Sequence, residues 1–235
     1  MECTDRQRQI LDFLSDRQFA SVSELAELLF TSGATVRREI KRLEEKGLLE
    51  SVYGGVVLRE YRQEPVPVYL RDGDHAAEKE KLAWEASQMI RDGQTVMLDA
   101  SSTVRRICRH ILDRKGLTVI TNNLRVCQEL KNSNIRVICT GGTLLPRREC
   151  FVGHLAEEFL KGIHADILFF SSQGLSAGGM ITDSSEEEIA LRKVMLSCAD
   201  RQIFLCDRSK LHKTYPIALC HTSAITRVLL SPEQP

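Results

Sequence analysis

Apolar residues recur at the spacing of an α-helix in three stretches near the N-terminus. The three apolar stripes are Ile10, Leu11, Phe13 and Leu14; Leu25, Leu28 and Leu29; and Val36, Ile40 and Leu43. A residue that can cap a helix precedes each stripe, namely Thr4, Ser21 and Ser32. Gly47 follows the third stripe as a C-terminal glycine. The pattern predicts three short, separately capped helices.

The pattern after the third helix is that of strands. Residues 48–58 contain two short apolar runs around Gly54-Gly55, which predicts a β-hairpin. A tight turn at residues 30–33 separates the second and third helices. Three helices with such a turn, followed by a hairpin, form a winged helix-turn-helix. We assign residues 1–58 to this domain.

The third predicted helix carries a basic face. With its apolar stripe toward the core, an advance of about 100° per residue places Arg37, Arg38 and Lys41 on the outer side. The N-terminal part of such a helix approaches base edges in the major groove, where arginine can bridge guanine or clamp a phosphate. We therefore predict binding to double-stranded operator DNA. The alternatives are a merely solvated helix face and a winged helix that docks on protein; salt-insensitive binding would indicate the latter.

From residue 76 onward, short β-rich runs alternate with helical patterns. Strands are predicted at 95–98, 117–120, 135–139, 167–170, 202–206 and 228–230, with helices at 104–112, 124–131, 153–160 and 186–199. This alternation predicts an α/β domain over residues 76–235, with a mostly parallel sheet covered on both faces. Residues 59–75 lack apolar periodicity and contain Pro65 and Pro67, which is typical of a linker.

Polar residues gather where these predicted strands end. The end segments are Asp99 to Thr103, Thr121 to Asn123, Thr140 to Gly142, Ser171 to Gly174 and Asp207 to Lys210. Ligand sites of parallel sheets lie at the carboxyl ends of the strands. Hydroxyls and free backbone N–H groups at a helix start bind anions, and a lysine neutralises phosphate. We predict a phosphorylated polyol as the ligand.

Composition narrows the setting. The 235 residues carry no formal net charge, so the DNA prediction depends on where the positive charges lie. No apolar stretch approaches the roughly 18 residues of a membrane span, and the first residues lack a secretory layout. We expect a cytoplasmic protein without a membrane partner. The eight cysteines form no Cys-x-x-Cys pair, and most, such as Cys139, fall in apolar runs. We expect buried thiols, no metal site and no cofactor.

The third helix and the hairpin resemble the DeoR family. Ser32 to Ile40 is similar to the signature Ser-x-x-Thr-(Ile/Val)-Arg-Arg-Asp-Leu, with Glu39 in place of Asp, and Tyr53 replaces the usual His of the wing. Leu43 to Leu49 and Tyr53-Gly54-Gly55 continue the match. From the outer face and this resemblance we predict DNA contacts at Ser32, Thr35, Arg37, Arg38, Lys41, Tyr53 and Gly54.

The strand-end motifs resemble the DeoR-type sensor domain, so the match covers about residues 4–231. That domain shows Asp-x-Gly-Thr-Thr, Thr-Asn, Gly-Gly, Gly-Ala-Asp-Gly and Asp-x-Ser-Lys in this order, with a Thr…Glu…Lys pattern that Thr182, Glu187 and Lys193 match. The predicted effector-binding residues are Asp99, Ser101, Ser102, Thr103, Thr121, Asn122, Gly141, Gly142, Gln173, Gly174, Glu187 and Lys210. The resemblance implies the fold of ribose-phosphate and glucosamine-phosphate isomerases, assembly into a homodimer or homotetramer, and repression of sugar-catabolic genes relieved by a sugar phosphate.

Two departures from the family pattern affect the site. Gln173 stands where the family has Asp, and Ser101 replaces Gly. An active sugar-phosphate isomerase is the alternative, and it needs a base within about 3 Å of the proton that it takes. Asp99, Asp183, Glu187 and Asp207 are candidates, with His154 and His212 as possible partners. Because Gln173 cannot act as a base, and a fused DNA reader does not suit plain metabolism, we predict a regulator and not an enzyme.

Overall fold

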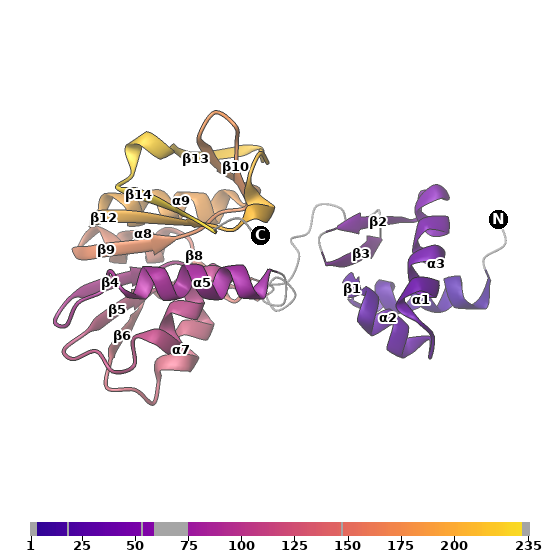
Figure 1. The fold of residues 1–235 in the computed structure, drawn as a ribbon, viewed down its shortest axis with the longest axis horizontal. Helices are drawn as coiled ribbons and strands as arrows, with labels where there is room; N and C mark the ends of the chain where they lie inside the picture. Colours follow the sequence, from indigo (N-terminus) through magenta and orange to yellow (C-terminus); the bar gives the residue numbers. More distant parts are fainter. Residues whose placement is uncertain (1–3, 18, 53, 59–74, 147, 232–235) are drawn as a thin grey trace. The chain divides into compact units, whose positions relative to one another are not determined.

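The computed structural model describes residues 4–17, 19–52, 54–58, 75–146 and 148–231. The chain divides into two compact units, Met1–Asp74 and His75–Pro235, and each is described by itself (Figure 1). The predicted linker lies outside the described residues, apart from His75.

The first unit is a winged helix-turn-helix, as the sequence predicted. Its helices are α1 (Asp5–Arg17), α2 (Val22–Leu28) and α3 (Gly33–Glu45). Its antiparallel sheet has the order β1–β3–β2, formed by β1 (Phe19–Ser21), β2 (Leu49–Val52) and β3 (Gly55–Leu58). The sequence predicted the β2–β3 hairpin but not β1, which has only three residues.

Local side-chain caps explain where the helices begin. The Ser21 hydroxyl accepts from the Glu24 amide (3.1 Å), and the Glu24 carboxylate accepts from the Ser21 amide (2.8 Å), which completes a capping box on α2. Ser32 caps α3 by accepting from the Thr35 amide (3.3 Å). The predicted apolar stripes meet in one core, which includes Ile10, Leu14, Leu25, Val36, Ile40, Leu43, Leu49 and Val56.

The second unit contains a sheet of six parallel strands in the order β14–β12–β9–β4–β5–β6. The strands are β4 (Thr95–Leu98), β5 (Thr118–Thr121), β6 (Arg136–Cys139), β9 (Ala165–Phe170), β12 (Ala199–Cys206) and β14 (Arg227–Leu230). Strands β5 and β6 extend the sheet to one side of β4, and β9, β12 and β14 extend it to the other. This doubly wound order confirms the predicted α/β class.

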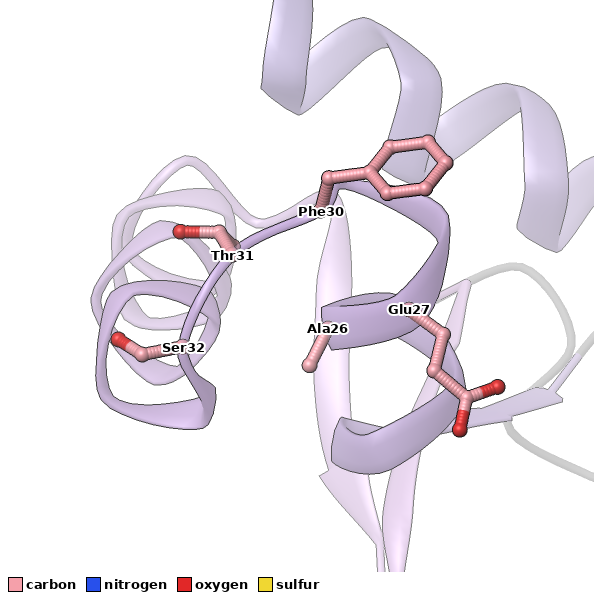
Figure 2. Close-up of a pocket in the computed structure, with 5 residues that line it drawn as sticks. All are labelled: Ala26, Glu27, Phe30, Thr31 and Ser32. Carbon is pink, nitrogen blue, oxygen red and sulfur yellow. The ribbon is translucent and has the colours of Figure 1, made fainter.

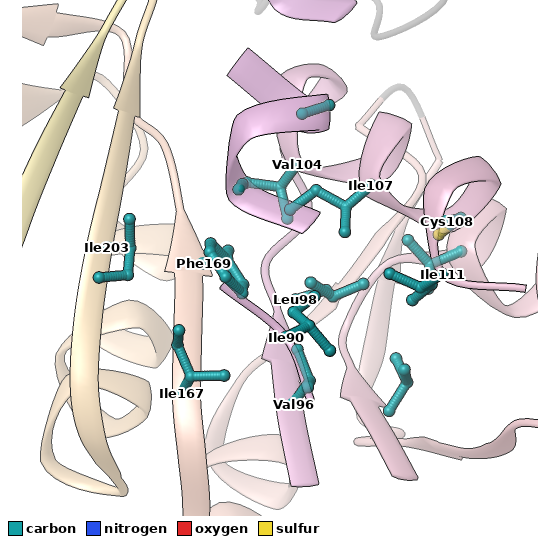
Figure 3. Close-up of a cluster of buried hydrophobic side chains, with 14 of the residues drawn as sticks. Ile90, Val96, Leu98, Val104, Ile107, Cys108, Ile111, Ile167, Phe169 and Ile203 are labelled. Atoms are coloured by element: carbon teal, nitrogen blue, oxygen red, sulfur yellow. The ribbon is translucent and has the colours of Figure 1, made fainter. Parts of the chain in front are cut away.

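Helices cover both faces of this sheet (Figure 1). Alternate residues of β4 point to opposite faces, because Val96 and Leu98 belong to one apolar cluster and Met97 to the other. Figure 3 shows the first cluster, in which Val96 and Leu98 lie near Phe169. The covering elements of that face are α5 (Ala76–Ser87), α6 (Ser102–Arg105), η2 (Arg106–His110) and α7 (Leu124–Leu130). Those of the second face are α8 (His154–Lys161) and α9 (Glu186–Ser197).

Short strands outside the main sheet escaped sequence prediction. They form the hairpin of β7 (Thr143–Leu145) and β8 (Cys150–Val152), and a sheet ordered β10–β11–β13, made of β10 (Gly174–Leu175), β11 (Met180–Asp183) and β13 (Ile217–His221). The remaining elements are the 3-10 turns η3 (Arg208–Lys210) and η4 (Thr222–Ala224). Among the described residues, no helix has the length and apolar character needed to cross a membrane.

Candidate DNA-binding surface and effector site

The outer face of α3 carries the predicted basic residues. Arg37, Arg38 and Lys41 are exposed, whereas the opposite face is buried in the core. Arg38 donates to the Thr35 hydroxyl over 3.4 Å, which orients its guanidinium toward the start of the helix. Within the described part of the chain, none of these three cations forms an ion pair. Their charge is therefore available to a phosphate or a base edge.

Glu39, the acidic residue of the signature, forms hydrogen bonds inside the domain. Glu39 is buried and accepts from the Gln7 side chain (2.7 Å) and from Arg42 (2.8 Å). Lys46 donates to the same Gln7 side chain over 2.9 Å. These hydrogen bonds join α3 to α1, so Glu39 positions the helix without pairing with Arg37.

The wing depends on two glycines. Val52 pairs with Gly55, so the connecting turn has two residues, and Gly54 adopts a φ of 85°. A Cβ on Gly55 would lie 2.1 Å from the carbonyl oxygen of Ala20, because β3 packs closely on β1 there. The Ser51 amide donates to Glu44 over 2.6 Å and ties the wing to α3. Gly54 is exposed, and Tyr53 lies outside the described residues.

The turn between α2 and α3 contains an unusual aromatic residue. Phe30 is 97% exposed and has a φ of 48°. The Phe30 amide donates to the carbonyl of Glu27 (3.2 Å), and the Thr31 amide donates to that of Ala26 (3.0 Å). This is a helix C-terminus in which the position of Phe30 is usually occupied by glycine. An open surface hollow is lined by these residues and Ser32, and the Phe30 ring points away from the Thr31 and Ser32 side chains (Figure 2).

Of the effector residues predicted in the second unit, Asp99 and Ser101 follow β4, which pairs with β9. These neighbouring strands are where the strand order reverses, which is where ligands bind in doubly wound folds. Asp99 follows β4 and accepts from the amides of Ser171 (3.1 Å) and Ser101 (3.0 Å). Its own amide donates to the carbonyl of Phe169 over 3.1 Å. Asp99 therefore holds the ends of both strands together.

Lys210 links a third strand end to those of β4 and β9. Its ammonium group donates to the hydroxyls of Ser171 (2.6 Å) and Thr103 (3.5 Å), and lies 3.2 Å from an oxygen of Asp207. Burial opposes ionisation of Asp207, but Lys210 keeps the pKa of that carboxyl below its ordinary value. The Asp207 carboxylate is thus favoured in its ionised form, and Lys210 stands beside hydroxyls that a phosphate would also approach.

A buried ion network lies behind Asp99. Arg192 donates to Asp99 (3.1 Å) and Asp183 (3.3 Å), and it lies 3.9 Å from Glu188. Arg148 contacts Glu188 and lies 4.0 Å from Asp183. All five side chains are buried. Three carboxylates around two guanidinium groups make a network that is nearly balanced in charge.

Sequence reasoning did not identify the two arginines. The available signal was helical spacing, because Glu188 and Arg192 are four residues apart on the face of α9 that also carries the buried Met195. The predicted Glu187 lies one residue away, is exposed, and accepts from the Ser185 hydroxyl over 3.2 Å. The structure does not bring Glu187 into the buried cluster.

Asp183 places a carboxylate across from Gln173, the residue that stands where the family has Asp. Gly174 pairs with Thr182 in the antiparallel β10–β11 ladder, so the residue after Thr182 lies across from Gln173. The Ser172 hydroxyl donates to Asp183 over 3.1 Å. Burial opposes ionisation here too, yet Arg192 and Arg148 hold the pKa of Asp183 below its ordinary value.

The other predicted residues lie at the ends of β5 and β6 and at the start of α6. The buried Thr121 hydroxyl donates to the carbonyl of Leu98 over 2.7 Å. Asn122 donates to the carbonyl of Phe151 (3.0 Å), and its buried amide oxygen has no hydrogen-bond partner among the described residues. Gly141 and Gly142 have φ values of 66° and 102°, and a Cβ on Gly142 would lie 2.6 Å from a backbone oxygen. The Ser101 hydroxyl caps α6, which contains Ser102 and Thr103.

Comparison with known proteins places both units in one family. Residues 6–62 match the DeoR-like helix-turn-helix domain, and residues 74–231 match the DeoR C terminal sensor domain. The chain belongs to the DeoR family of transcriptional regulators. This outcome confirms the family that the sequence motifs indicated.

Full-length relatives of this DeoR-family chain are transcriptional regulators. The uncharacterized HTH-type regulator YulB of Bacillus subtilis (strain 168) is 34% identical over 211 residues, covering 89% of this chain and 81% of that protein. The transcriptional repressor AccR of Agrobacterium fabrum is 32% identical over 212 residues, with coverages of 89% and 82%. The L-fucose operon activator of Escherichia coli (strain K12) is 29% identical over 232 residues, with coverages of 97% and 95%. Among solved structures, ribose 5-phosphate isomerase from Methanocaldococcus jannaschii aligns with 59% of this chain and 55% of its own at a TM-score of 0.45 and 17% identity.

Proposed function

We propose that this DeoR-family regulator is a repressor of sugar-metabolism genes. It binds operator DNA through α3 and the wing, and a phosphorylated sugar bound between β4 and β9 releases it. The observation that carries the DNA part is the exposed basic face of α3, where Arg37 and Arg38 have no acidic partner among the described residues. Such cations contribute by displacing the counterions of phosphates.

The sugar-phosphate part is supported by the chemistry of these strand ends. Lys210 provides a compact positive charge, and Ser171 and Thr103 place hydroxyls beside it. At the start of α6 the Ser101 amide donates to Asp99 (3.0 Å) and the Ser101 hydroxyl accepts from the Val104 amide (3.0 Å), so this segment is polar and hydrogen-bonded. A phosphate with adjacent hydroxyl groups can replace the hydrogen bonds that these groups make to one another.

The state of the carboxylates favours binding over turnover. Asp183 and Asp207 have lowered pKa values, and both are held by cations in the fold. Asp99 already accepts from two amides and from Arg192. A general base must be free to take a proton near the operating pH. We infer that these strand ends bind a ligand without converting it.

The test uses DNA selected from a random library by the purified chain, and a panel of sugar phosphates. We expect tight, salt-dependent binding to the selected DNA, and weaker binding when one sugar phosphate is added. Binding that does not change with salt would instead indicate docking on protein. Dilution-dependent sedimentation tests the proposed homodimer or homotetramer, which helix-turn-helix proteins use to engage two half-sites.

The sign of regulation needs a separate readout. One relative is named a repressor and another an operon activator. A reporter gene downstream of the selected DNA should be silent with the regulator and active when the sugar phosphate accumulates. Activation of the reporter by the regulator alone would contradict repression but leave DNA binding intact.

A further inference from the structure

Phe30, in the turn between α2 and α3, is both exposed and strained. Its side chain is 97% exposed, so the ring gains almost no stability from burial. Its φ of 48° lies in the left-handed region, where a bulky residue is an outlier. Among the exposed large apolar side chains of the described residues, Phe30 alone has a positive φ. Exposed apolar residues are common on protein surfaces, but backbone strain at the same position indicates a functional role.

The turn itself does not require the phenyl ring. The Phe30 amide donates to the carbonyl of Glu27 over 3.2 Å, and the chain then reaches Ser32, the cap of α3. Glycine at this position would make the same backbone hydrogen bond without strain. The apolar core of the unit does not include Phe30. Because neither the turn nor the core uses the ring, a contact outside the unit best accounts for it.

Phe30 lies beside the end of α3 that we assign to DNA. It precedes Gly33, the first residue of α3, by three positions. The guanidinium of Arg37 folds back to this end, because its Nη1 atom lies 3.6 Å from the position that a Cβ on Gly33 would occupy. Arg38 donates to the Thr35 hydroxyl over 3.4 Å, also toward the start of the helix. The cations that would attract DNA therefore gather near the turn, and bound DNA would bring base pairs close to Phe30.

The chemistry of the turn favours an uncharged part of the DNA. Glu27 is exposed and lines the same surface hollow as Phe30, so a phosphate group would meet a negative charge there (Figure 2). The phenyl ring has no hydrogen-bond donor or acceptor for the polar edges of bases. The apolar group that the major groove presents is the methyl group of thymine, and phenylalanine is among the side chains that contact it.

We propose that Phe30 is a specificity-determining residue that contacts the methyl group of a thymine. This inference rests on the proposed DNA binding by α3. The ring points away from the Ser32 side chain (Figure 2), so the thymine flanks the base pairs that α3 reads. The backbone strain lowers the stability of the free protein, and the ring becomes useful only when DNA covers it. Replacement by glycine should thus relieve the strain and remove the preference for thymine.

A scan of the selected DNA with uracil tests this contact. Each thymine is replaced in turn by uracil, which removes only the methyl group and keeps the base pair. At one flanking position the wild type should bind about fourfold more weakly, the effect of losing one buried methyl group. Phe30→Gly should bind the unmodified DNA more weakly than the wild type does, and should show no further loss with uracil at that position.

Two more variants separate the ring from the backbone. Phe30→Asn tolerates a left-handed backbone but is polar, so it should behave as Phe30→Gly does. Phe30→Leu keeps an apolar side chain and should retain part of the response to uracil. Thymines that other residues read provide the internal control, because their replacement should weaken the wild type and Phe30→Gly equally.

Selection of DNA from a random library by Phe30→Gly is the second measurement. The sequences that it selects should match those of the wild type except at one flanking position, where thymine is no longer preferred. The proposal is overturned if no flanking uracil weakens the wild type, or if Phe30→Gly responds to every uracil as the wild type does. Salt-dependent DNA binding would survive either result, so only the Phe30 contact would be wrong. If the wild type selects no DNA at all, the proposed function and the contact are both wrong.

Discussion

Replacing Arg192 by methionine tests the buried ion network that includes Asp99 and Asp183. The substitution keeps the volume of the side chain roughly constant and removes the charge that faces Asp99 (3.1 Å) and Asp183 (3.3 Å). Both carboxylates are at most 3% exposed, so water cannot replace the guanidinium. Removal of one partner of a buried pair costs about 3–5 kcal/mol. That loss is a large part of the roughly 5–15 kcal/mol that stabilises a typical domain.

Urea unfolding followed by tryptophan fluorescence measures this loss of stability in the second unit of the chain. Trp84 is the only tryptophan of the chain and lies on α5, so its signal reports on the second unit. Lys193→Met is the matched control, because Lys193 is the next residue and is exposed. We expect the control to change the free energy of unfolding by less than about 0.5 kcal/mol.

The pH dependence of this loss provides a second signature. The pKa of Asp183 is lowered in the folded wild type, so the stability that it contributes is present above its unfolded pKa and is lost as the pH falls through the folded value. Without Arg192, burial raises the pKa of the same carboxyl and acid relieves the buried charge. The difference in stability between wild type and variant should therefore shrink from pH 7 to pH about 4. A variant as stable as the Lys193 control at pH 7 would refute this account of the network.

Two further substitutions test separate parts of the account. Phe30→Gly should stabilise the first unit by about 1 kcal/mol, because a left-handed backbone strains an L-residue and suits glycine; unfolding followed by circular dichroism measures this change in stability. A loss of stability would show instead that contacts of the exposed Phe30 ring stabilise the unit. Lys210→Ala should weaken sugar-phosphate binding by about 1.5–3 kcal/mol, the value of a hydrogen bond to a charged group. Calorimetry measures that loss, DNA affinity should stay unchanged, and unaltered ligand binding would remove Lys210 from the site.

The elements that sequence reasoning found are those with local causes. The capping box at Ser21 and the hydroxyl cap at Ser32 are formed by residues three positions apart, so the start of each helix is readable from the chain. The central strands of the parallel sheet, such as β4 and β9, are apolar and buried on both faces, which separates them from the amphipathic helices between them.

The features that it missed depend on distant partners. The strand β10 has two residues and exists because β11 pairs with it. Arg148 and Arg192 are charged, and a charged residue in a sequence is expected in solvent unless its buried partners are known. The position of Asp183 across from Gln173 depends on the pairing register of β10 and β11, which the sequence alone does not determine. The expectation of a buried thiol is wrong for Cys139, which is exposed at the end of β6, and it holds for Cys108, Cys150, Cys198 and Cys206.

The effect of salt on DNA binding is the most direct test of the central claim. The affinity of the wild type for its selected DNA should fall steeply as the salt concentration rises. The double variant Arg37→Ala, Arg38→Ala should bind more weakly. It should also reduce the slope of log affinity against log salt by about 2, because each phosphate contact contributes about 0.9. Arg42→Ala is a control from the same helix, because Arg42 pairs with Glu39. A double variant that binds the selected DNA as tightly as the wild type, with the same slope, would contradict the assignment of α3 as the DNA-reading helix.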